Sequence, residues 1–266
     1  YGIPSSLRKV TVTDATKLSY GAFSNCSMLT EVNINEGITT IDGQAFSGCS
    51  GITEITVPGS VTSIGEYAFS GCKGLTRVNA ASIEAWSKIA FTDATANPTY
   101  YGKKLYVDGK EVTTVTIPEG ITKVSGYAFI NCEDITAVTV PASAASIGTY
   151  AFKGCSSLVN VTLSEGIKTV DTYVFSNCTS LKKITVPKSV TEIGYSAFQG
   201  CTSLEEMTLP FVGMSKTASS GWQELLGAIF GQSTTGVKQY YYSSDSGVPY
   251  GIPSSLRKVT VTDATK

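Results

Sequence analysis

The stretch LKKITVPKSVTEIGYSAFQGC, residues 181–201, contains the pattern that decides the fold. Its spacing of Leu, Ile, Val, Ala-Phe and Cys recurs along the chain with a period of 23 residues. Such a period is typical of proteins in which each repeat buries its apolar residues against its neighbours. The sequence therefore predicts a solenoid whose stacked turns share one core. The predicted core positions are Phe23, Phe46, Phe69, Phe129, Phe152, Phe175, Phe198, Cys26, Cys49, Cys72, Cys132, Cys155, Cys178 and Cys201.

Each repeat begins with a segment typical of a short strand. Apolar Leu158, Val161 and Leu163 alternate with polar Asn160 and Thr162, which indicates that one face of the strand is buried. Strands of successive turns should pair side by side, and the second half of the repeat should turn back through a short extended piece and a helical turn. We therefore expect a mainly β fold, a parallel sheet with short helical turns.

Some repeats depart from the common pattern. Asn35 and Ser164 stand where most repeats have proline, and Asp171 stands where Gly65, Gly148 and Gly194 occur in other repeats. We expect local irregularity at these positions and no change of fold.

Two helix-containing inserts interrupt what we predict to be a single solenoid over residues 1–266. The first, 80–111, contains SIEAWSKIAF (82–91), whose apolar spacing predicts a short helix, and LYVDGKEV (105–112), which predicts a hairpin turning at Asp108-Gly109. The second, 210–249, contains GWQELLGAIFG (221–231), which predicts another helix followed by a loop.

Residues 250–266 repeat residues 1–17 letter for letter. We interpret them as the start of the next copy in a tandem array, so the chain would be a piece of a longer protein; an engineered duplication is the alternative. Identical sequences should adopt the same conformation at both ends. We also expect a head-to-tail self-contact through the two ends, where strand edges are open.

Composition argues against several classes of function. The chain has no histidine, a net charge of −1 and only 15% charged residues. Histidine is the commonest general base, and nucleic-acid binding needs a basic surface. The sequence also lacks glycine-rich phosphate loops and long apolar stretches. We therefore expect no enzyme activity, no cofactor or metal, no nucleic-acid partner and no insertion into a membrane.

The seven cysteines could suggest a metal site or disulfide bonds. However, they are never closer than 23 residues, whereas zinc sites need pairs of ligands a few residues apart. Equivalent positions on stacked turns have parallel Cβ directions, which is unfavourable for a disulfide. We interpret the cysteines as small buried thiols that fill one corner of each turn.

The outward side of the predicted sheet offers two further patterns. Glu31, Glu54 and Glu206 could act in a hydrolase that uses only carboxylates, but Lys9, Arg77 and Lys183 occupy the same repeat position, which favours a solvated face of mixed charge. A polar row could bind a repetitive ligand or could reflect strand propensity and cross-strand pairing. That row comprises Thr11, Asn33, Thr56, Asn79, Thr116, Thr139, Thr162, Thr185 and Thr208.

Aromatic residues in the two inserts are the candidate ligand contacts, because loops on a rigid scaffold often carry recognition. The alternative is that they pack the inserts against the solenoid. The candidates are Trp86, Tyr100, Tyr101, Trp222, Tyr240, Tyr241 and Tyr242.

The repeats TSLEEMTLP, IPEGITKVSGYAFINC and ITVPKSVTEIGYSAFQGC resemble those of BspA-like bacterial leucine-rich repeat surface proteins. The resemblance covers almost the whole chain. It implies a right-handed leucine-rich repeat solenoid, an extracellular location at the cell surface, and non-enzymatic adhesion to a host or microbial protein or glycan. A passive spacer in a tandem-repeat surface protein is the alternative, and an exported hydrolase is a remote one.

Overall fold

The structure is a computed structural model that describes residues 4, 6–217, 221–240 and 247–263. Contacts between Cα atoms divide the chain into two compact units. Unit 1 comprises Tyr1–Thr113 and Ser125–Asp134, and unit 2 comprises Thr114–Val124 and Ile135–Lys266. We describe each unit by itself, and the single solenoid over residues 1–266 stays a prediction.

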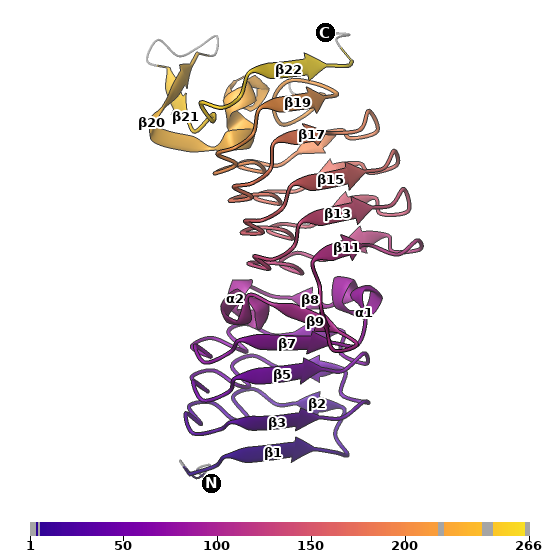
Figure 1. Ribbon diagram of the computed structural model, residues 1–266, viewed down its shortest axis with the longest axis vertical. Coiled ribbons are helices and arrows are strands. Elements are labelled where there is room, and N and C mark those ends of the chain that lie inside the picture. Colours follow the sequence, from indigo (N-terminus) through magenta and orange to yellow (C-terminus); the bar gives the residue numbers. More distant parts are fainter. Residues whose placement is uncertain (1–3, 5, 218–220, 241–246, 264–266) are drawn as a thin grey trace. The chain divides into compact units, whose positions relative to one another are not determined.

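Unit 1 is built from short strands that repeat along the chain (Figure 1). Its strands are β1 (Lys9–Val12), β2 (Lys17–Leu18), β3 (Glu31–Ile34), β4 (Thr40–Ile41), β5 (Glu54–Val57), β6 (Ser63–Ile64), β7 (Arg77–Ala80), β8 (Ala90–Phe91), β9 (Leu105–Val107) and β10 (Lys110–Glu111). Its helices are α1 (Ile83–Lys88), the 3₁₀ helix η1 (Ala94–Ala96) and α2 (Thr99–Gly102).

The strands of unit 1 form parallel ladders between successive turns. One row contains β1 with β3, then β5, β7 and β9, and a second row contains β2, β4, β6 and β8. Ile55 pairs with Val78, one period later, so equivalent repeat positions meet across the ladder. The predicted parallel solenoid of 23-residue repeats is therefore confirmed.

The first insert contains a helix and a hairpin. Ser82 caps α1 by accepting a hydrogen bond from the N–H of Ala85, as its sequence position suggests. The helix is shorter than the predicted 82–91, because Ile89 is extended and the next two residues pair with β6 as β8. Strands β9 and β10 are antiparallel, and Asp108 and Gly109 between them both have positive φ, 51° and 74°.

Unit 2 repeats the same plan. Its strands are β11 (Thr114–Thr116), β12 (Lys123–Val124), β13 (Ala137–Val140), β14 (Ser146–Ile147), β15 (Asn160–Leu163), β16 (Thr169–Val170), β17 (Lys183–Thr185), β18 (Glu192–Ile193), β19 (Glu206–Leu209), β20 (Gln232–Gln239), β21 (Val248–Tyr250) and β22 (Lys258–Val261). Its 3₁₀ helices are η2 (Trp222–Glu224) and η3 (Leu226–Phe230).

The second insert corrects a prediction. Residues 221–231 form two 3₁₀ helices and not one α-helix, because Leu225 between them is extended. Glycine further weakens helix formation here. Gly227 packs so closely on Tyr250 that a Cβ at this position would lie 2.2 Å from the tyrosine ring. The insert then continues as the antiparallel pair β20 and β21.

The core follows the predicted positions. Phe46 and Phe69 are fully buried in unit 1, with ring centroids 5.4 Å apart, and Phe152 and Phe175 stack at 5.8 Å in unit 2. Phe23, in the first turn, is only half-buried. All seven cysteines are buried, and none of them forms a disulfide bond.

The thiols also make a contact that the sequence pattern did not indicate. The Sγ–H of Cys49 donates to the backbone oxygen of Phe23 at 3.0 Å, and that of Cys72 donates to Phe46 at 3.1 Å. Cys178 and Cys201 repeat the contact in unit 2. Each such thiol therefore joins its own turn to the preceding one.

Two of the predicted irregularities coincide with interruptions of the sheet. Strands β3 and β5 lie side by side, as do β15 and β17, but within the described residues no ladder joins the members of either pair. Asn35 follows β3 and Ser164 follows β15, so irregularity at these positions is confirmed. At Asp171 the prediction is wrong: the ladder β14-β16-β18 continues, and the carboxylate accepts the N–H of Thr172.

A glutamate bridges the turns beside each interruption. Glu36 accepts the N–H groups of Gly59 and Ser60 at 2.9 and 3.0 Å. Glu165 accepts those of Lys188 and Ser189 at 3.1 and 2.9 Å. These backbone hydrogen bonds hold the pKa of both carboxyls below the usual value of glutamate.

The duplicated segments adopt the same local structure over their described residues. Lys9–Val12 and Lys258–Val261 are both parallel strands, and the N–H of Leu7 and of Leu256 each donates to the proline oxygen three residues earlier. In both strands the lysine lies opposite a glutamate, Glu31 or Glu206. The predicted equivalence is confirmed for residues 4 and 6–14 against residues 253 and 255–263, and the rest of the comparison lies outside the described residues.

Candidate functional site

The outward face of the unit 1 sheet carries charges of both signs. Lys9 Nζ lies 2.6 Å from Glu31 Oε1, and Arg77 Nε lies 3.2 Å from Glu54 Oε1. In unit 2, Lys183 Nζ lies 3.1 Å from Glu206 Oε1. The three glutamates considered above for hydrolysis are thus each paired with a cation, which confirms a solvated face of mixed charge.

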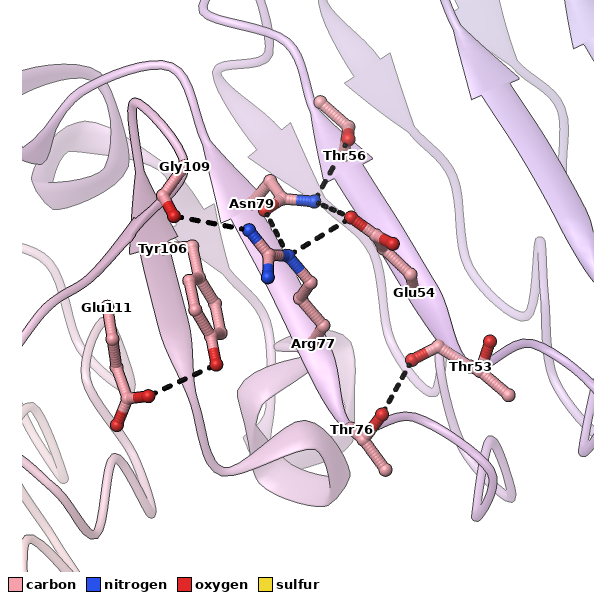
Figure 2. Close-up of polar contacts among 9 residues, drawn as sticks. All are labelled: Thr53, Glu54, Thr56, Thr76, Arg77, Asn79, Tyr106, Gly109 and Glu111. Atoms are coloured by element: carbon pink, nitrogen blue, oxygen red, sulfur yellow. Dashed lines mark hydrogen bonds and ion pairs between the residues drawn. The ribbon is translucent and has the colours of Figure 1, made fainter.

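The Arg77 cluster, comprising Glu54, Arg77, Asn79 and Tyr106, joins charged, polar and aromatic side chains on this face (Figure 2). The guanidinium carbon of Arg77 lies 3.8 Å from the centroid of the Tyr106 ring, a cation–π contact. Arg77 Nε donates to Asn79 Oδ1 at 3.1 Å, and Asn79 Nδ2 donates to Glu54 Oε1 at 2.6 Å. The guanidinium is therefore fixed by a ring on one side and by polar groups on the other.

The hairpin of the first insert positions Tyr106. Strand β9 pairs in parallel with β7, so that Tyr106 lies opposite Asn79 and beside Arg77. Tyr106 Oη donates to Glu111 Oε2 at 3.1 Å across the hairpin. Tyr106 thus occupies the repeat position at which other turns have a threonine or asparagine of the polar row.

Lys104 forms two ion pairs next to the Arg77 cluster. Lys104 Nζ lies 2.9 Å from Asp134 Oδ2 and 3.0 Å from Glu111 Oε1. The hydrogen bond that Lys104 donates to Asp134, followed by the one that it donates to Glu111, raises the pKa of Lys104, and Lys104 lowers the pKa of Asp134. Glu111 therefore links the lysine to the hydroxyl of Tyr106.

A hollow of about 280 Å³ lies where the ladder is interrupted between β3 and β5. Its walls are mainly polar, and the Glu31 carboxylate has a pKa lowered by hydrogen bonds from Lys9 and Asn33. Glu54 belongs both to this hollow and to the Arg77 cluster. The lining residues are Thr30, Glu31, Val32, Asn33, Thr53, Glu54 and Thr56.

The polar row is present in the predicted register. Thr56 pairs with Asn79, Thr116 with Thr139, and Thr185 with Thr208. In unit 1, Asn79 Nδ2 also lies 3.3 Å from Thr56 Oγ1. This bond supports the interpretation as cross-strand pairing.

The aromatic candidates of the first insert are largely packed. Trp86 is 1% exposed, and its indole N–H donates to the oxygen of Ala128 at 2.6 Å, so it is not accessible to a ligand in the folded chain. Tyr100 and Tyr101 are half-buried with edge-to-face rings, and the Tyr101 hydroxyl accepts the N–H of Gly71.

The aromatic candidates of the second insert are more accessible. Trp222 is 39% exposed and meets Tyr195 edge-to-face at 5.6 Å, and Tyr240 is 61% exposed. Tyr241 and Tyr242 lie outside the described residues. The structure thus does not bring the candidates of the two inserts into one described cluster.

Sequence reasoning missed a row of tyrosines in unit 2. Tyr150 and Tyr173 stack with centroids 4.8 Å apart and planes 4° apart, and Tyr173 meets Tyr195 edge-to-face at 6.2 Å. The signal was available, since a tyrosine precedes the phenylalanine of successive repeats by two or three residues. Tyr106 was missed because its contact with Arg77 depends on the hairpin.

Within the described residues, no group of three or more His, Cys, Asp or Glu side chains could hold a metal ion. None of the helices described is long and apolar enough to cross a membrane.

The repeats match the family model described as the BspA type leucine rich repeat region, in six copies, over residues 4–98 and 99–219. The chain belongs to the BspA-type leucine-rich repeat family. The leucine-rich repeat fold implied by the resemblance is therefore confirmed. No curated protein sequence matches the chain.

Solved structures show the same fold. A leucine rich cell surface protein from Faecalibacterium prausnitzii A2-165 is similar over 96% of this BspA-type chain and 60% of its own, with 23% identity and a TM-score of 0.56. The pneumococcal vaccine antigen PcpA is similar over 97% and 64%, with 16% identity and a TM-score of 0.55. The chain thus spans less than two thirds of either protein.

Proposed function

We propose that this chain is a non-enzymatic protein-binding module whose contact surface is the outward face of the unit 1 sheet. The observation that carries the proposal is the Arg77 cluster, in which a guanidinium is stacked on Tyr106 and held by Asn79 and Glu54. Arginine and tyrosine are enriched among the residues that dominate protein interfaces. Because their side chains are already ordered, they would lose little conformational freedom on binding.

The surroundings of the cluster also suit a protein partner. Paired charges and a polar hollow border it, which matches the polar rim of an interface. A location at the cell surface is part of the proposal. It is supported by membership of the BspA-type family and by the description of the Faecalibacterium protein as a cell surface protein.

The test measures binding of the purified chain to a panel of extracellular host and bacterial surface proteins by a biosensor. We expect saturable binding to at least one protein, weakened at least about tenfold in the double variant Arg77→Ala, Tyr106→Ala. Lys183→Ala is the matched control, because Lys183 is also paired with a glutamate on the sheet face of unit 2. Equal losses in both variants, or none in either, would place the contact elsewhere.

A spacer is the second candidate function, and the duplicated segment favours it. The strand Lys258–Val261 extends the ladder of unit 2 with the sequence of β1, as a further copy in a tandem array would. Additional copies would add length as readily as binding sites. Absence of binding to the whole protein panel, by a chain shown to be folded, would favour the spacer.

A further inference from the structure

A second hollow, of about 280 Å³, lies in unit 2 at the end of the tyrosine row. Its lining residues are Tyr195, Trp222, Gln232 and Val248. They come from a repeat turn, from η2, and from the first residues of β20 and β21. All four residues belong to unit 2, whereas the face proposed above as the protein-binding surface belongs to unit 1.

The walls of the hollow are held by contacts within unit 2. The backbone N–H of Gln232 donates to Tyr195 Oη at 2.9 Å, and the oxygen of Tyr195 accepts the N–H of Tyr173. The oxygen of Gln223 in η2 accepts the N–H of Met214 at 2.8 Å. The aromatic wall is thus anchored to the solenoid turn and to the insert.

The tyrosine row changes its geometry at this point. Tyr150 and Tyr173 stack face to face and so cover each other's rings, whereas Tyr195 meets both Tyr173 and Trp222 at 88°. Trp222 ends the row with 39% of its surface exposed. Within the described residues, its indole N–H donates no hydrogen bond, and the carboxamide of Gln232 makes none. Two polar groups are therefore available beside an aromatic surface.

We propose that this hollow binds one uncharged pyranose ring of a glycan. The described lining has no charged side chain, which matches a neutral ligand. An exposed indole offers an apolar surface for the C–H face of a sugar, and the carboxamide and indole N–H can bind its hydroxyl groups. The volume is just below the range of about 300–1,000 Å³ for drug-sized ligands, so it suits a single ring.

The two tryptophans of the chain allow a direct test by NMR of the indole N–H signals. We would titrate the full chain with the methyl glycosides of glucose, galactose, mannose and N-acetylglucosamine. For at least one sugar, the Trp222 signal should shift and saturate at about 1 mM ligand, whereas that of buried Trp86 should not move. Movement of neither signal with any of the four sugars would overturn the proposal.

Variants separate this site from other surfaces. Trp222→Ala should weaken sugar binding at least tenfold, as measured from the shifts of backbone amide signals. Gln232→Ala should also weaken sugar binding. Tyr240→Ala is the matched control, since Tyr240 is an exposed aromatic outside the lining and its loss should change nothing. Unchanged binding in Trp222→Ala would contradict the proposal. The Arg77→Ala, Tyr106→Ala variant should retain sugar binding whether or not it binds proteins.

Discussion

At the scale of single residues, the phenylalanine of each repeat stabilises more than its own turn. Phe175 is fully buried and stacks on Phe152 and on Phe198, each with centroids 5.8 Å apart. A ring removed from such a stack leaves a cavity that the stacked turns on either side cannot easily close. The energetic consequence of a substitution should therefore depend on how completely the ring is enclosed.

We expect Phe152→Ala to lower the free energy of unfolding by about 3–5 kcal/mol. Phe152 is fully buried, and the variant loses both the apolar burial and the contacts of the stack. Urea denaturation followed by circular dichroism provides the measurement. Phe23→Ala is the control and should cost less, since Phe23 is half-buried. A loss below about 1 kcal/mol for Phe152→Ala would show that the position is not a core position.

The thiols should be chemically inert in the folded chain. Burial raises the pKa of Cys49, Cys72, Cys132 and Cys201 to about 12, and the reactive form of cysteine is the thiolate. We expect no rapid reaction of these four with a thiol reagent at pH 8, and reaction of all seven cysteines in denaturant. Rapid labelling of any of the four in the native state would contradict their burial.

At the scale of elements, the two interrupted ladders show how the repeat tolerates a change of sequence. Strands β3 and β5, and strands β15 and β17, lie side by side without ladder hydrogen bonds in the described residues. The bridges from Glu36 and Glu165 hold the adjoining turns together at the same places. These bridges should therefore contribute to stability only while the carboxyls are ionised.

We expect Glu165→Gln to destabilise the chain at pH 7, with an effect that decreases as the pH falls below the unfolded pKa of glutamate. The pKa of Glu165 is lowered in the folded state, chiefly by the hydrogen bond from the N–H of Ser189. The ionised carboxylate therefore contributes to the free energy of unfolding above the unfolded pKa of about 4.3, and this contribution is lost as the pH falls through the folded pKa. Urea midpoints measured against pH provide the test. Glu119→Gln is the control, because Glu119 stands at the same repeat position, and within the described residues its carboxylate makes no such bridge. Equal effects of the two substitutions would contradict the assignment.

Hydrogen exchange should detect the interruptions directly. The amides of β5 and β17 that face the preceding strand should exchange faster than the equivalent amides of β7 and β19, which are in ladders. Exchange followed by NMR or mass spectrometry provides the measurement. Equal protection of β5 and β7 would show that the ladder continues in solution.

The sequence predicted most elements because the repeat imposes the same contacts on every turn. It predicted the core rings, the strands and the hairpin at Asp108-Gly109, all of which follow from local pattern. It did not predict the 3₁₀ helices at 222–230, because the close packing of Gly227 on Tyr250 is a tertiary contact. Trp222 was among the aromatic candidates, but the hollow beside it and the Arg77 cluster were missed, since each combines an insert with a repeat turn.

At the scale of the whole molecule, the duplicated strand determines which residues would lie opposite each other if two chains paired end to end. Lys9 lies opposite Glu31, and Lys258 lies opposite Glu206. If β22 of one chain met β1 of another in the same register, the two lysines would face each other. The expected head-to-tail contact would therefore work against charge repulsion.

We expect such self-association to be weak at low salt and stronger at high salt, because salt screens the repulsion between the lysines. Sedimentation velocity at increasing protein concentration provides the measurement. Lys258→Glu should strengthen the association at low salt by placing a glutamate opposite Lys9. A chain that stays monomeric at high concentration and high salt would remove the head-to-tail contact.

The hydrogen bonds between turns run in both directions along the chain. The Cys49 thiol donates backward to Phe23, whereas the N–H of Phe46 donates forward to the oxygen of Ala68 in the turn that follows. Each turn is therefore fully bonded only when the next one is in place, and an unbonded buried N–H is costly. During synthesis from the N-terminus, each turn should therefore become fully ordered only after the repeat that follows it has been synthesised.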